Sequence, residues 1–385
     1  MRPIPLVDLV AQWEAIREEA EPAIAEVLAS GAFVLGPVVE RFEREFARWV
    51  GASRAVGVGN GTDAVEIALR SCGIGPGDQV LVPANTFVAS AIGVLRAGAT
   101  PVYVDCDERT FLVDLEAASR SVTPRTRALL PVHLYGRLCD PASLRSFALA
   151  HRVVVVEDAA QAHGAGSPAG RAGSIGLAAA FSFYPGKNLG AAGDAGAVTT
   201  RDAEVAGRAA AIRNYGSPRK HEHPAFGVNS RLDALQAAIL GVKLRRADAW
   251  NLARRRVAAR YAERLEGVDG LELPRPAPDG EHVYHLYVVR VTGGRRDAVL
   301  AALGEAGIGA GIHYPTPVPF LPAVASGARP GDFPVSERLA GEILSLPIHP
   351  ELDEGSVDFV CDRLRSALRG TPAARAAQLQ NSSTA

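Results

Sequence analysis

The sequence has no surplus of charge of either sign, and it has few cysteines. Its 385 residues include 41 Lys and Arg and 42 Asp and Glu, which gives a formal net charge of −1 at pH 7. This balance gives no general reason to expect nucleic acid or an anionic membrane as a partner. The cysteines form no Cys-x-x-Cys pair and are scattered at Cys72, Cys106, Cys139 and Cys361. We therefore expect reduced packing residues rather than a disulfide framework or a zinc site.

Long hydrophobic segments are also missing. No uninterrupted apolar run reaches the roughly 20 residues that a membrane-spanning helix needs. The N-terminus carries Asp8, Glu14 and Glu18 and lacks the basic-then-apolar pattern of a secretory signal. We expect a soluble, cytoplasmic protein. Its length suits one large domain and a smaller one.

Short apolar runs alternate with helical stretches over the first half of the chain. Two helices are expected first, over residues 12–29 and 36–50. The expected strands are 54–58, 79–82, 101–104, 127–131, 152–156, 179–183 and 196–199. Helices are expected between them at 62–72, 86–97, 114–120 and 141–150. Strands rich in Val and Leu that alternate with helices predict a mostly parallel sheet covered on both faces.

The second half predicts a smaller unit. One long amphipathic helix is expected over 230–248, and a basic helix follows up to residue 265. After a stretch with Pro and Gly at 268–281 come a strand at 284–291 and helices at 296–306 and 353–369. We expect a large domain over 1–248 and a small C-terminal domain over 249–370. The small and polar residues of 371–385 predict a disordered tail.

The segment 154–163 places two acidic residues at the end of a predicted buried strand. This strand delivers Glu157 and Asp158 at its carboxyl end, where open α/β sheets bind ligands. A carboxylate there can pair with the ring nitrogen of pyridoxal phosphate (PLP), because a protonated pyridine is the better electron sink for a carbanion. Taken alone, the motif favours a simpler interpretation, in which the Asp caps the next helix.

Lys187 lies among small and aromatic residues in the segment 181–190, just after another predicted strand. A lysine kept partly away from water has a lowered pKa and can form a Schiff base with an aldehyde. Ser182, five residues earlier, can donate its hydroxyl to a phosphate oxygen. A lysine near Pro-Gly is more commonly a surface residue of a turn. The occurrence of Asp158 29 positions earlier argues against that alternative.

Glycines in the segment 57–65 lead directly into a predicted helix, whose first N–H groups can hold an anion. The segment lacks the later glycine and the acidic residue of a dinucleotide fingerprint, and it lacks the lysine of a P-loop. It therefore suits the phosphate of a compact cofactor better than NAD or ATP. Phe87, after the next strand, can stack on a pyridine ring or serve as a core aromatic, and its segment alone does not decide between the two.

These features occur in the order Thr62, Phe87, Asp158 and Lys187, and with them the chain resembles the DegT/DnrJ/StrS family of PLP-dependent nucleotide-sugar aminotransferases. The resemblance covers nearly the whole chain. It rests on the segments 33–37, 59–64, 157–164, 181–190, 213–216, 227–233, 313–315 and 346–348. It implies an α/β fold of fold type I, like that of aspartate aminotransferase. That fold has a large domain with a mostly parallel sheet flanked by helices, plus a smaller C-terminal α+β domain.

The resemblance implies a role for each matching residue. Lys187 would carry the cofactor and move the proton during transfer, and Asp158 would pair with the pyridine nitrogen. The other implied cofactor contacts are Gly61, Thr62 and Ser182 at the phosphate, Phe87 on the ring, Gln161 at the phenolic oxygen, and Asn229 at the phosphate of the neighbouring subunit. The last of these implies a homodimer with shared active sites. The implied substrate contacts, which also suit a loop lysine and packing aromatics, are Tyr184, Lys220, His313 and Tyr314.

The substrate is implied by finer detail. The segments 183–190 and 193–196 resemble those of enzymes that act on dTDP-3-keto-6-deoxyhexoses. Many sugar 4-aminotransferases have Glu-Gly in place of Asp194 and Ala195, and a His in place of Gln161. Gln161 also occurs in aminocyclitol enzymes, and His221 stands where relatives often have Tyr. We expect transfer from L-glutamate to the C3 ketone of the sugar, by way of pyridoxamine phosphate.

Other interpretations stay open. They are a nucleotide-sugar 4-aminotransferase, an aminocyclitol (scyllo-inosose-type) aminotransferase, and a PLP-binding regulator without turnover. A metal site at His221 and His223 is a weaker interpretation, because no third ligand lies nearby in the sequence.

Overall fold

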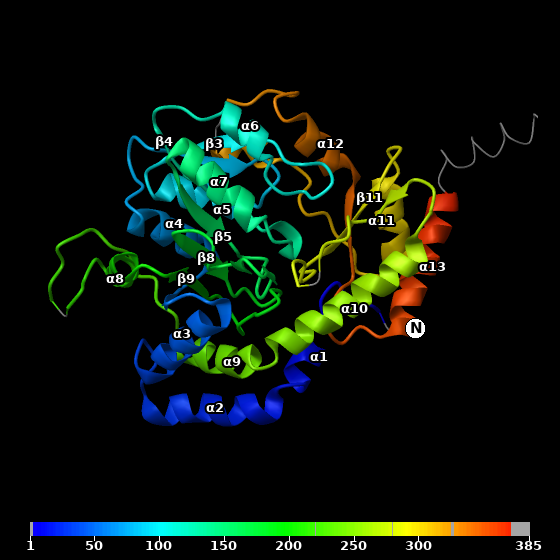
Figure 1. The fold of residues 1–385 in the computed structure, drawn as a ribbon. Helices are drawn as coiled ribbons and strands as arrows, with labels where there is room; N and C mark the ends of the chain where they lie inside the picture. The colour runs from blue at the N-terminus through cyan, green and yellow to red at the C-terminus, as the bar shows by residue number, and fades with distance from the viewer. Residues whose placement is uncertain (1–2, 220, 279, 325–326, 371–385) are drawn as a thin grey trace, which may run out of the picture.

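The computed structural model describes residues 3–219, 221–278, 280–324 and 327–370, which form a larger and a smaller lobe (Figure 1). The larger lobe is built on a seven-stranded sheet with the order β1-β9-β8-β5-β4-β2-β3. Its strands are β1 (Arg54–Val58), β2 (Gln79–Pro83), β3 (Thr100–Val104), β4 (Thr126–Leu129), β5 (Val154–Asp158), β8 (Ala178–Ser182) and β9 (Gly196–Thr200). Only β9 runs antiparallel to its neighbours. The predicted α/β class with a mostly parallel sheet is confirmed.

Helices cover both faces of this sheet because its strands are apolar on both sides. Ala179 and Phe181 of β8 pack on the side of α3 (Pro37–Val50) and α9 (Ala234–Leu244). Ala178 and Ala180 pack on the opposite side, with α4 (Gly61–Ser71), α5 (Val88–Arg96) and α8 (Ala203–Ile212). Two further helices, α6 (Leu115–Arg120) and α7 (Pro141–His151), cover β2 and β4. A short hairpin of β6 (Gly166–Ser167) and β7 (Gly170–Arg171) follows β5.

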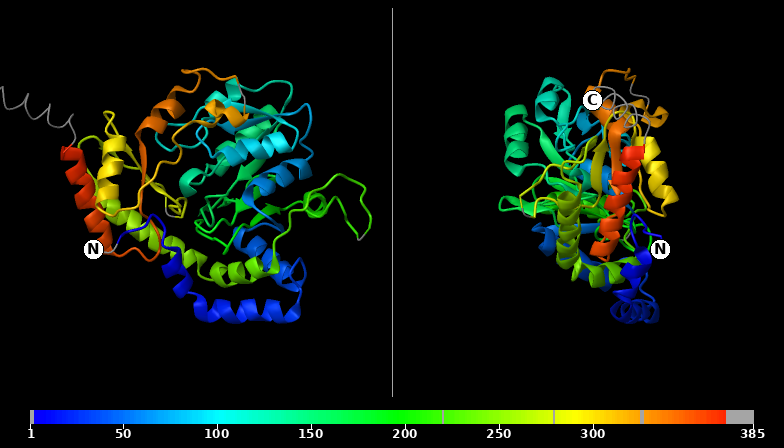
Figure 2. Two further views of the ribbon diagram at one scale, coloured as in Figure 1. Left: turned by 180° about the vertical axis from the view of Figure 1, so that it is seen from behind. Right: turned by 90° about the vertical axis from the view of Figure 1, so that its right-hand side faces the viewer.

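The smaller lobe is an antiparallel sheet with helices. Its strands are β10 (Leu271–Glu272), β11 (Tyr287–Val291) and β12 (Ile343–Leu346), in that order. The long helix α10 (Ala247–Leu265), α11 (Arg296–Glu305) and α13 (Glu354–Gly370) share its apolar core. α10 runs along both lobes, as Figures 1 and 2 show. Ile4 also belongs to the core of the small lobe, although the sequence places residues 1–248 in the large domain.

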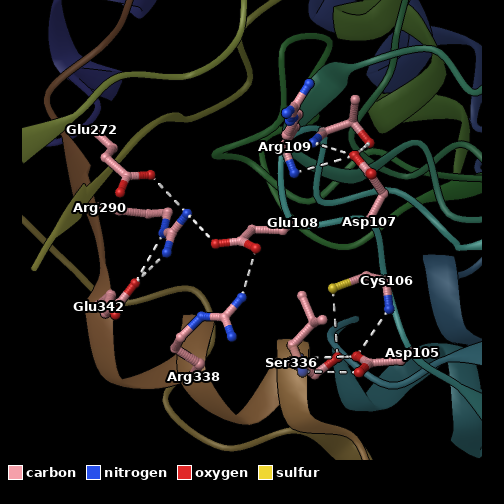
Figure 3. A network of polar contacts seen from close by, with 12 residues as sticks. Asp105, Cys106, Asp107, Glu108, Arg109, Glu272, Arg290, Ser336, Arg338 and Glu342 are labelled. Carbon is pink, nitrogen blue, oxygen red and sulfur yellow. Dashed lines mark hydrogen bonds and ion pairs between the residues drawn. The ribbon is translucent and has the colours of Figure 1, made fainter.

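A polar network joins the two lobes (Figure 3). Arg290 of β11 contacts three carboxylates, those of Glu108 at 2.9 Å, Glu272 at 2.7 Å and Glu342 at 2.7 Å. Glu108 follows β3 of the large sheet. Nearby, Asp105 accepts the backbone N–H of Ser336 at 2.9 Å and so fixes the start of α12 (Pro334–Glu342). These contacts hold the small lobe against the edge of the large sheet.

Two predicted helices are wrong in detail. The helix expected over 12–29 is two helices, α1 (Leu9–Glu14) and α2 (Arg17–Ser30), because Ile16 between them is buried against α9. The helix expected over 230–248 begins only at Ala234, because the Ser230 hydroxyl bonds to Asp63 and Gly59 and holds this stretch extended. It ends at Leu244, and α10 begins three residues later.

Strand β5 also lies two residues later than predicted, so Glu157 and Asp158 belong to the strand itself. The four cysteines are free, and three of them are buried, as expected of packing residues. Among the described residues, no helix has the length and apolarity that crossing a membrane would need.

Candidate active site

A cavity of about 700 Å³ lies at the carboxyl ends of the parallel strands, and both lobes contribute to its walls. This is where open α/β sheets bind ligands. Of the residues predicted for the site, those that line it are Gly61, Thr62, Phe87, Asp158, Gln161, Ser182, Tyr184, Lys187, His313 and Tyr314. They come from segments more than 250 residues apart in the sequence. The fold therefore brings together what the sequence presents separately.

Asp158 is a buried carboxylate that points into this cavity from the end of β5. Its Oδ2 accepts the Ser90 hydroxyl at 2.7 Å, and its Oδ1 accepts the Ala160 N–H at 3.1 Å. Because the Ser90 hydroxyl donates to Asp158, it accepts from the Thr86 hydroxyl, which lies 2.8 Å away. These two hydrogen bonds fix the orientation of the carboxylate in the cavity.

The neighbouring acid, Glu157, has a different role. Strand alternation turns it away from the cavity, and it is fully buried. Its carboxylate accepts backbone N–H groups from Gly173, Ile175 and Gly176 at 2.8–2.9 Å, and it lies 2.9 Å from His133 Nε2. Glu157 therefore braces the loop between β7 and β8.

Lys187 lies in a tight turn after β8 and is half-buried. Burial lowers the pKa of its amine to about 8, against the opposing attraction of Asp158. The turn is fixed by the next residue, Asn188, whose side-chain amide donates to Asn251 at 2.9 Å and to the Val283 carbonyl at 3.0 Å. A substantial fraction of the lysine is thus neutral near pH 8, as a nucleophilic amine requires.

The start of α4 lies directly against the end of β8. A Cβ on Gly61 would be 2.5 Å from the Ser182 Cβ, so only glycine allows this approach. Asn60 caps the helix by accepting the Asp63 N–H at 2.9 Å, and the first N–H groups of the helix point at the cavity end. Arg96 also lines the cavity, but its guanidinium is paired with Asp63 and Glu66, each at 2.8 Å.

Aromatic and amide side chains form another wall. Phe87 is 50% exposed, and its ring centroid lies 5.2 Å from that of Tyr314. Gln161 accepts the Tyr135 N–H at 2.6 Å and donates to the Tyr314 hydroxyl at 3.1 Å. Burial raises the pKa of Tyr314 far above its usual value, so this hydroxyl stays protonated. His313 Nδ1 lies 2.8 Å from the Ser345 hydroxyl.

Sequence reasoning missed several residues of this cavity. His285 is buried, lines the cavity and has Nδ1 3.3 Å from Asn188 Oδ1. Burial and the charge of Lys187 hold its pKa well below the usual value, so the ring is neutral. Its only signal in the sequence is a polar residue inside an apolar, strand-like run. Ser90, Leu6 and Val7 also line the cavity, and no motif marks them.

Four residues that the sequence singled out do not line the cavity among the described residues, or lie outside them. Asn229 is exposed and does not line the cavity of its own chain. Lys220 lies outside the described residues. His221 and His223 are exposed, and His223 Nδ1 lies 3.0 Å from the Tyr215 carbonyl. Among the residues that the structure describes, no group of three or more His, Cys, Asp or Glu side chains is placed to hold a metal ion.

The arrangement fits pyridoxal phosphate. The half-buried amine of Lys187 and the buried carboxylate of Asp158 border one cavity. The start of α4, where Gly61 allows a close approach to β8, borders the same cavity. The three features match the aldehyde, the ring nitrogen and the phosphate of that cofactor. The neighbouring cation, Arg96, is already neutralised, which leaves N–H groups and the Ser182 hydroxyl as the donors for a phosphate.

Comparisons with known proteins agree with this site. Residues 14–365 match the DegT/DnrJ/EryC1/StrS aminotransferase family. A dTDP-3-amino-3,4,6-trideoxy-alpha-D-glucose transaminase of Streptomyces venezuelae is 48% identical over 363 residues, which cover 94% of this chain and 95% of the relative. The crystal structure of S. venezuelae DesV in complex with a ketimine intermediate has a TM-score of 0.93 and 47% identity, and covers 96% of this chain and 100% of that one. The crystal structure of NtdA from Bacillus subtilis, with bound cofactor PMP, has a TM-score of 0.86 and 30% identity. The match covers 92% of this chain and 82% of NtdA.

Proposed function

The chain belongs to the DegT/DnrJ/EryC1/StrS aminotransferase family, and from this premise we propose that it moves an amino group from L-glutamate to the C3 ketone of a dTDP-3-keto-6-deoxyhexose. It is a PLP-dependent sugar aminotransferase. The observation that carries the proposal is one cavity that holds both Lys187 and Asp158, in a chain 48% identical to a dTDP-3-amino-sugar transaminase. The reaction would supply an amino-deoxysugar for biosynthesis.

The cofactor, when bound, supplies the electron sink that stabilises a carbanion. In our proposal Asp158 pairs with its ring nitrogen, because this carboxylate is buried in the cavity and held in place by hydrogen bonds from Ser90 and Ala160. Lys187 would supply the neutral amine that carries the cofactor, and its Nζ would then move the proton between the substrate carbon and C4′ of the cofactor. The phosphate is held by N–H groups of Gly61 and Thr62 and by the Ser182 hydroxyl.

The remaining cavity residues orient the ring and the sugar. We assign Phe87 to the face of the ring, since it is half-exposed in the cavity, and Gln161 to the phenolic oxygen. Tyr184, His313 and Tyr314 line the same cavity and are assigned to the sugar or its diphosphate. Lys220 is assigned to the substrate on the family resemblance alone.

We further propose a homodimer in which each subunit completes the site of the other. Residues 213–219 and 221–230 follow α8 and extend away from the body of the large lobe (Figures 1 and 2). Asn214 and Asn229 pair across the base of this arm, and Phe226 on it is 84% exposed. Exposed aromatic residues on an arm suit burial against a second copy, which would bring Asn229 to the partner's phosphate site. The free thiols support a reducing, cytoplasmic location.

The test is product analysis. Protein loaded with PLP is incubated with L-glutamate and one acceptor at a time. The three acceptors are a dTDP-3-keto-6-deoxyhexose, a 4-keto isomer and scyllo-inosose. We expect 2-oxoglutarate in excess over the enzyme, together with a 3-amino sugar, from the first acceptor only, with the amino position read by NMR. Turnover with the 4-keto sugar or scyllo-inosose instead would correct the substrate. No 2-oxoglutarate with any acceptor would favour a regulator without turnover.

A further inference from the structure

The N-terminal segment is fixed to the small lobe. Ile4 N–H donates to the Gly307 carbonyl at 2.9 Å, and Gly309 N–H donates to the Ile4 carbonyl at 2.7 Å. The Ile4 side chain is 6% exposed, within the apolar core of that lobe. Two residues later the Leu6 carbonyl accepts the Ile348 N–H at 3.2 Å. Residues 4–6 therefore form an extended strap on the small lobe.

The next residues are fixed to the large lobe. Asp8 caps α1 by accepting the Ala11 N–H at 2.9 Å. Gln12 is buried and accepts the buried Lys243 amine at 2.7 Å. The same amine donates to the Gly190 carbonyl at 2.7 Å, within the turn that carries Lys187. The chain is thus fixed on both sides of Leu6 and Val7, to the small lobe at Ile4 and to the large lobe from Asp8 onward. Through Gln12 and Lys243, the contacts on the large lobe extend to the turn that carries Lys187.

Leu6 and Val7 line the active-site cavity between these anchors. Both are half-buried, and neither belongs to the apolar core clusters of the described residues. On the small-lobe side, Leu286 lines the same cavity. These two aliphatic side chains face the cavity from a fixed backbone and form an apolar wall. Such a wall binds apolar ligand surface favourably, because the surface is removed from water, and it offers no hydrogen bond to a polar group.

We propose that Leu6 and Val7 determine specificity by packing against the deoxygenated edge of the sugar, the C6 methyl and the adjoining ring carbons. This inference rests on the proposed function and names the part of the substrate that the chain's own N-terminus recognises. A sugar with a C6 hydroxyl would bury that hydroxyl against a wall that offers no partner. Discrimination by an apolar wall of this kind is roughly 10- to 100-fold.

The test compares dTDP-3-keto-6-deoxyglucose with its 6-hydroxy counterpart, dTDP-3-ketoglucose, as acceptors. The wild type should prefer the deoxysugar in kcat/KM. Val7→Thr keeps the shape of the side chain and adds a hydroxyl, and it should reduce this preference about 10-fold, mainly through KM for the deoxysugar. Leu6→Asn should do the same.

Val10→Thr is the matched control, because Val10 is 67% exposed on α1 and does not line the cavity. It should keep the wild-type preference. An unchanged preference in both Val7→Thr and Leu6→Asn, in protein that melts at the wild-type temperature, overturns the inference and leaves the proposed function standing. If the wild type does not use the 6-deoxy ketosugar at all, the proposed function falls and the inference falls with it.

Discussion

The cavity treats two ionisable residues, Asp158 and Lys187, differently. Asp158 accepts two hydrogen bonds, at 2.7 and 3.1 Å, which fix the position of its carboxylate. Lys187 is deprived of water, and its pKa falls to about 8. Pairing with a pyridinium needs a carboxylate fixed in position, and attack on an aldehyde needs an amine that is partly neutral.

The first prediction concerns Lys187 and stability without cofactor. The folded pKa of about 8 lies below the ordinary value of 10.5, so the fold disfavours the charged amine. The free energy of unfolding is therefore lowered by the full cost of burying the charged amine below pH 8, and this cost disappears as pH rises past 10.5. Lys187→Met should therefore raise the free energy of unfolding by about 1–3 kcal/mol at pH 7. Urea unfolding of the cofactor-free proteins at pH 7 and pH 10.5 measures this.

The comparison between the two pH values is its own control. Methionine also differs from lysine in apolar burial, but that contribution does not depend on pH. A Lys187→Met effect of the same size at pH 7 and pH 10.5 would contradict the lowered pKa.

The second prediction concerns Asp158. Asp158→Asn keeps the shape of the side chain and removes the charge, so the proposed stabilisation of a protonated ring nitrogen is lost. We expect the L-glutamate reaction to slow by roughly 10²–10³-fold, in line with the loss of one electrostatic stabiliser. Ser90→Ala removes only one hydrogen bond to the same carboxylate and should have a smaller effect. Stopped-flow absorbance measures both, and an unchanged rate in Asp158→Asn would count against its pairing with the ring.

The sequence predicts Asp158 and Lys187 because one lies at the end of a recognisable buried strand and the other soon after such a strand. It does not predict Ser90 or His285, whose places depend on how α5 and the small lobe meet the sheet. A polar residue inside an apolar run was the only local sign of His285, and nearby His282 carries the same sign without lining the cavity.

At the scale of elements, the site depends on how closely α4 approaches β8. Gly61→Ala would place a Cβ 2.5 Å from the Ser182 Cβ and push apart the two groups proposed to hold the phosphate. We predict that PLP affinity falls by about tenfold or more, equivalent to roughly 1.4 kcal/mol. Equilibrium titration followed by absorbance checks this.

Gly207→Ala is the control for that change. Gly207 lies inside α8, and a Cβ there meets nothing within 4 Å. It should leave PLP affinity unchanged and stabilise the fold by about 0.5–1 kcal/mol, because alanine is the better helix former. Wild-type affinity in Gly61→Ala would contradict the proposed cradle.

The strands of the large sheet could be predicted because each is a short apolar run, and their bounds agree with the structure to within two residues. The breaks between α1 and α2 and between α9 and α10 could not, because neither contains Gly or Pro. Ile16 marks the first break only through its burial against α9. β10 was missed because it has only two residues, and β12 was missed because Ser345 interrupts its apolar run.

At the scale of the whole molecule, the proposed dimer predicts complementation between two defective proteins. Lys187→Ala removes the amine from its own site, and Asn229→Ala removes the contact proposed for the partner's site. A mixed dimer would contain one site with both changes and one intact site. Mixing the variants under conditions that exchange subunits should therefore restore activity above that of either alone.

The control for complementation is Lys187→Ala mixed with Asp158→Asn, two residues that line the cavity of the same chain. In this pair, by contrast, the mixed dimer has the two changes in separate sites, so neither site is intact and activity should not recover. Recovery with this pair, or none with the Asn229→Ala pair, would contradict the shared site.

The most direct test of the central claim is the absorbance spectrum of the PLP-loaded protein. We predict a visible band that is absent in Lys187→Ala, that L-glutamate bleaches, and that a dTDP-3-keto-6-deoxyhexose then restores. Bleaching without restoration would leave the cofactor chemistry standing and refute the sugar. Correctly folded protein that shows no such band with PLP would contradict the account as a whole.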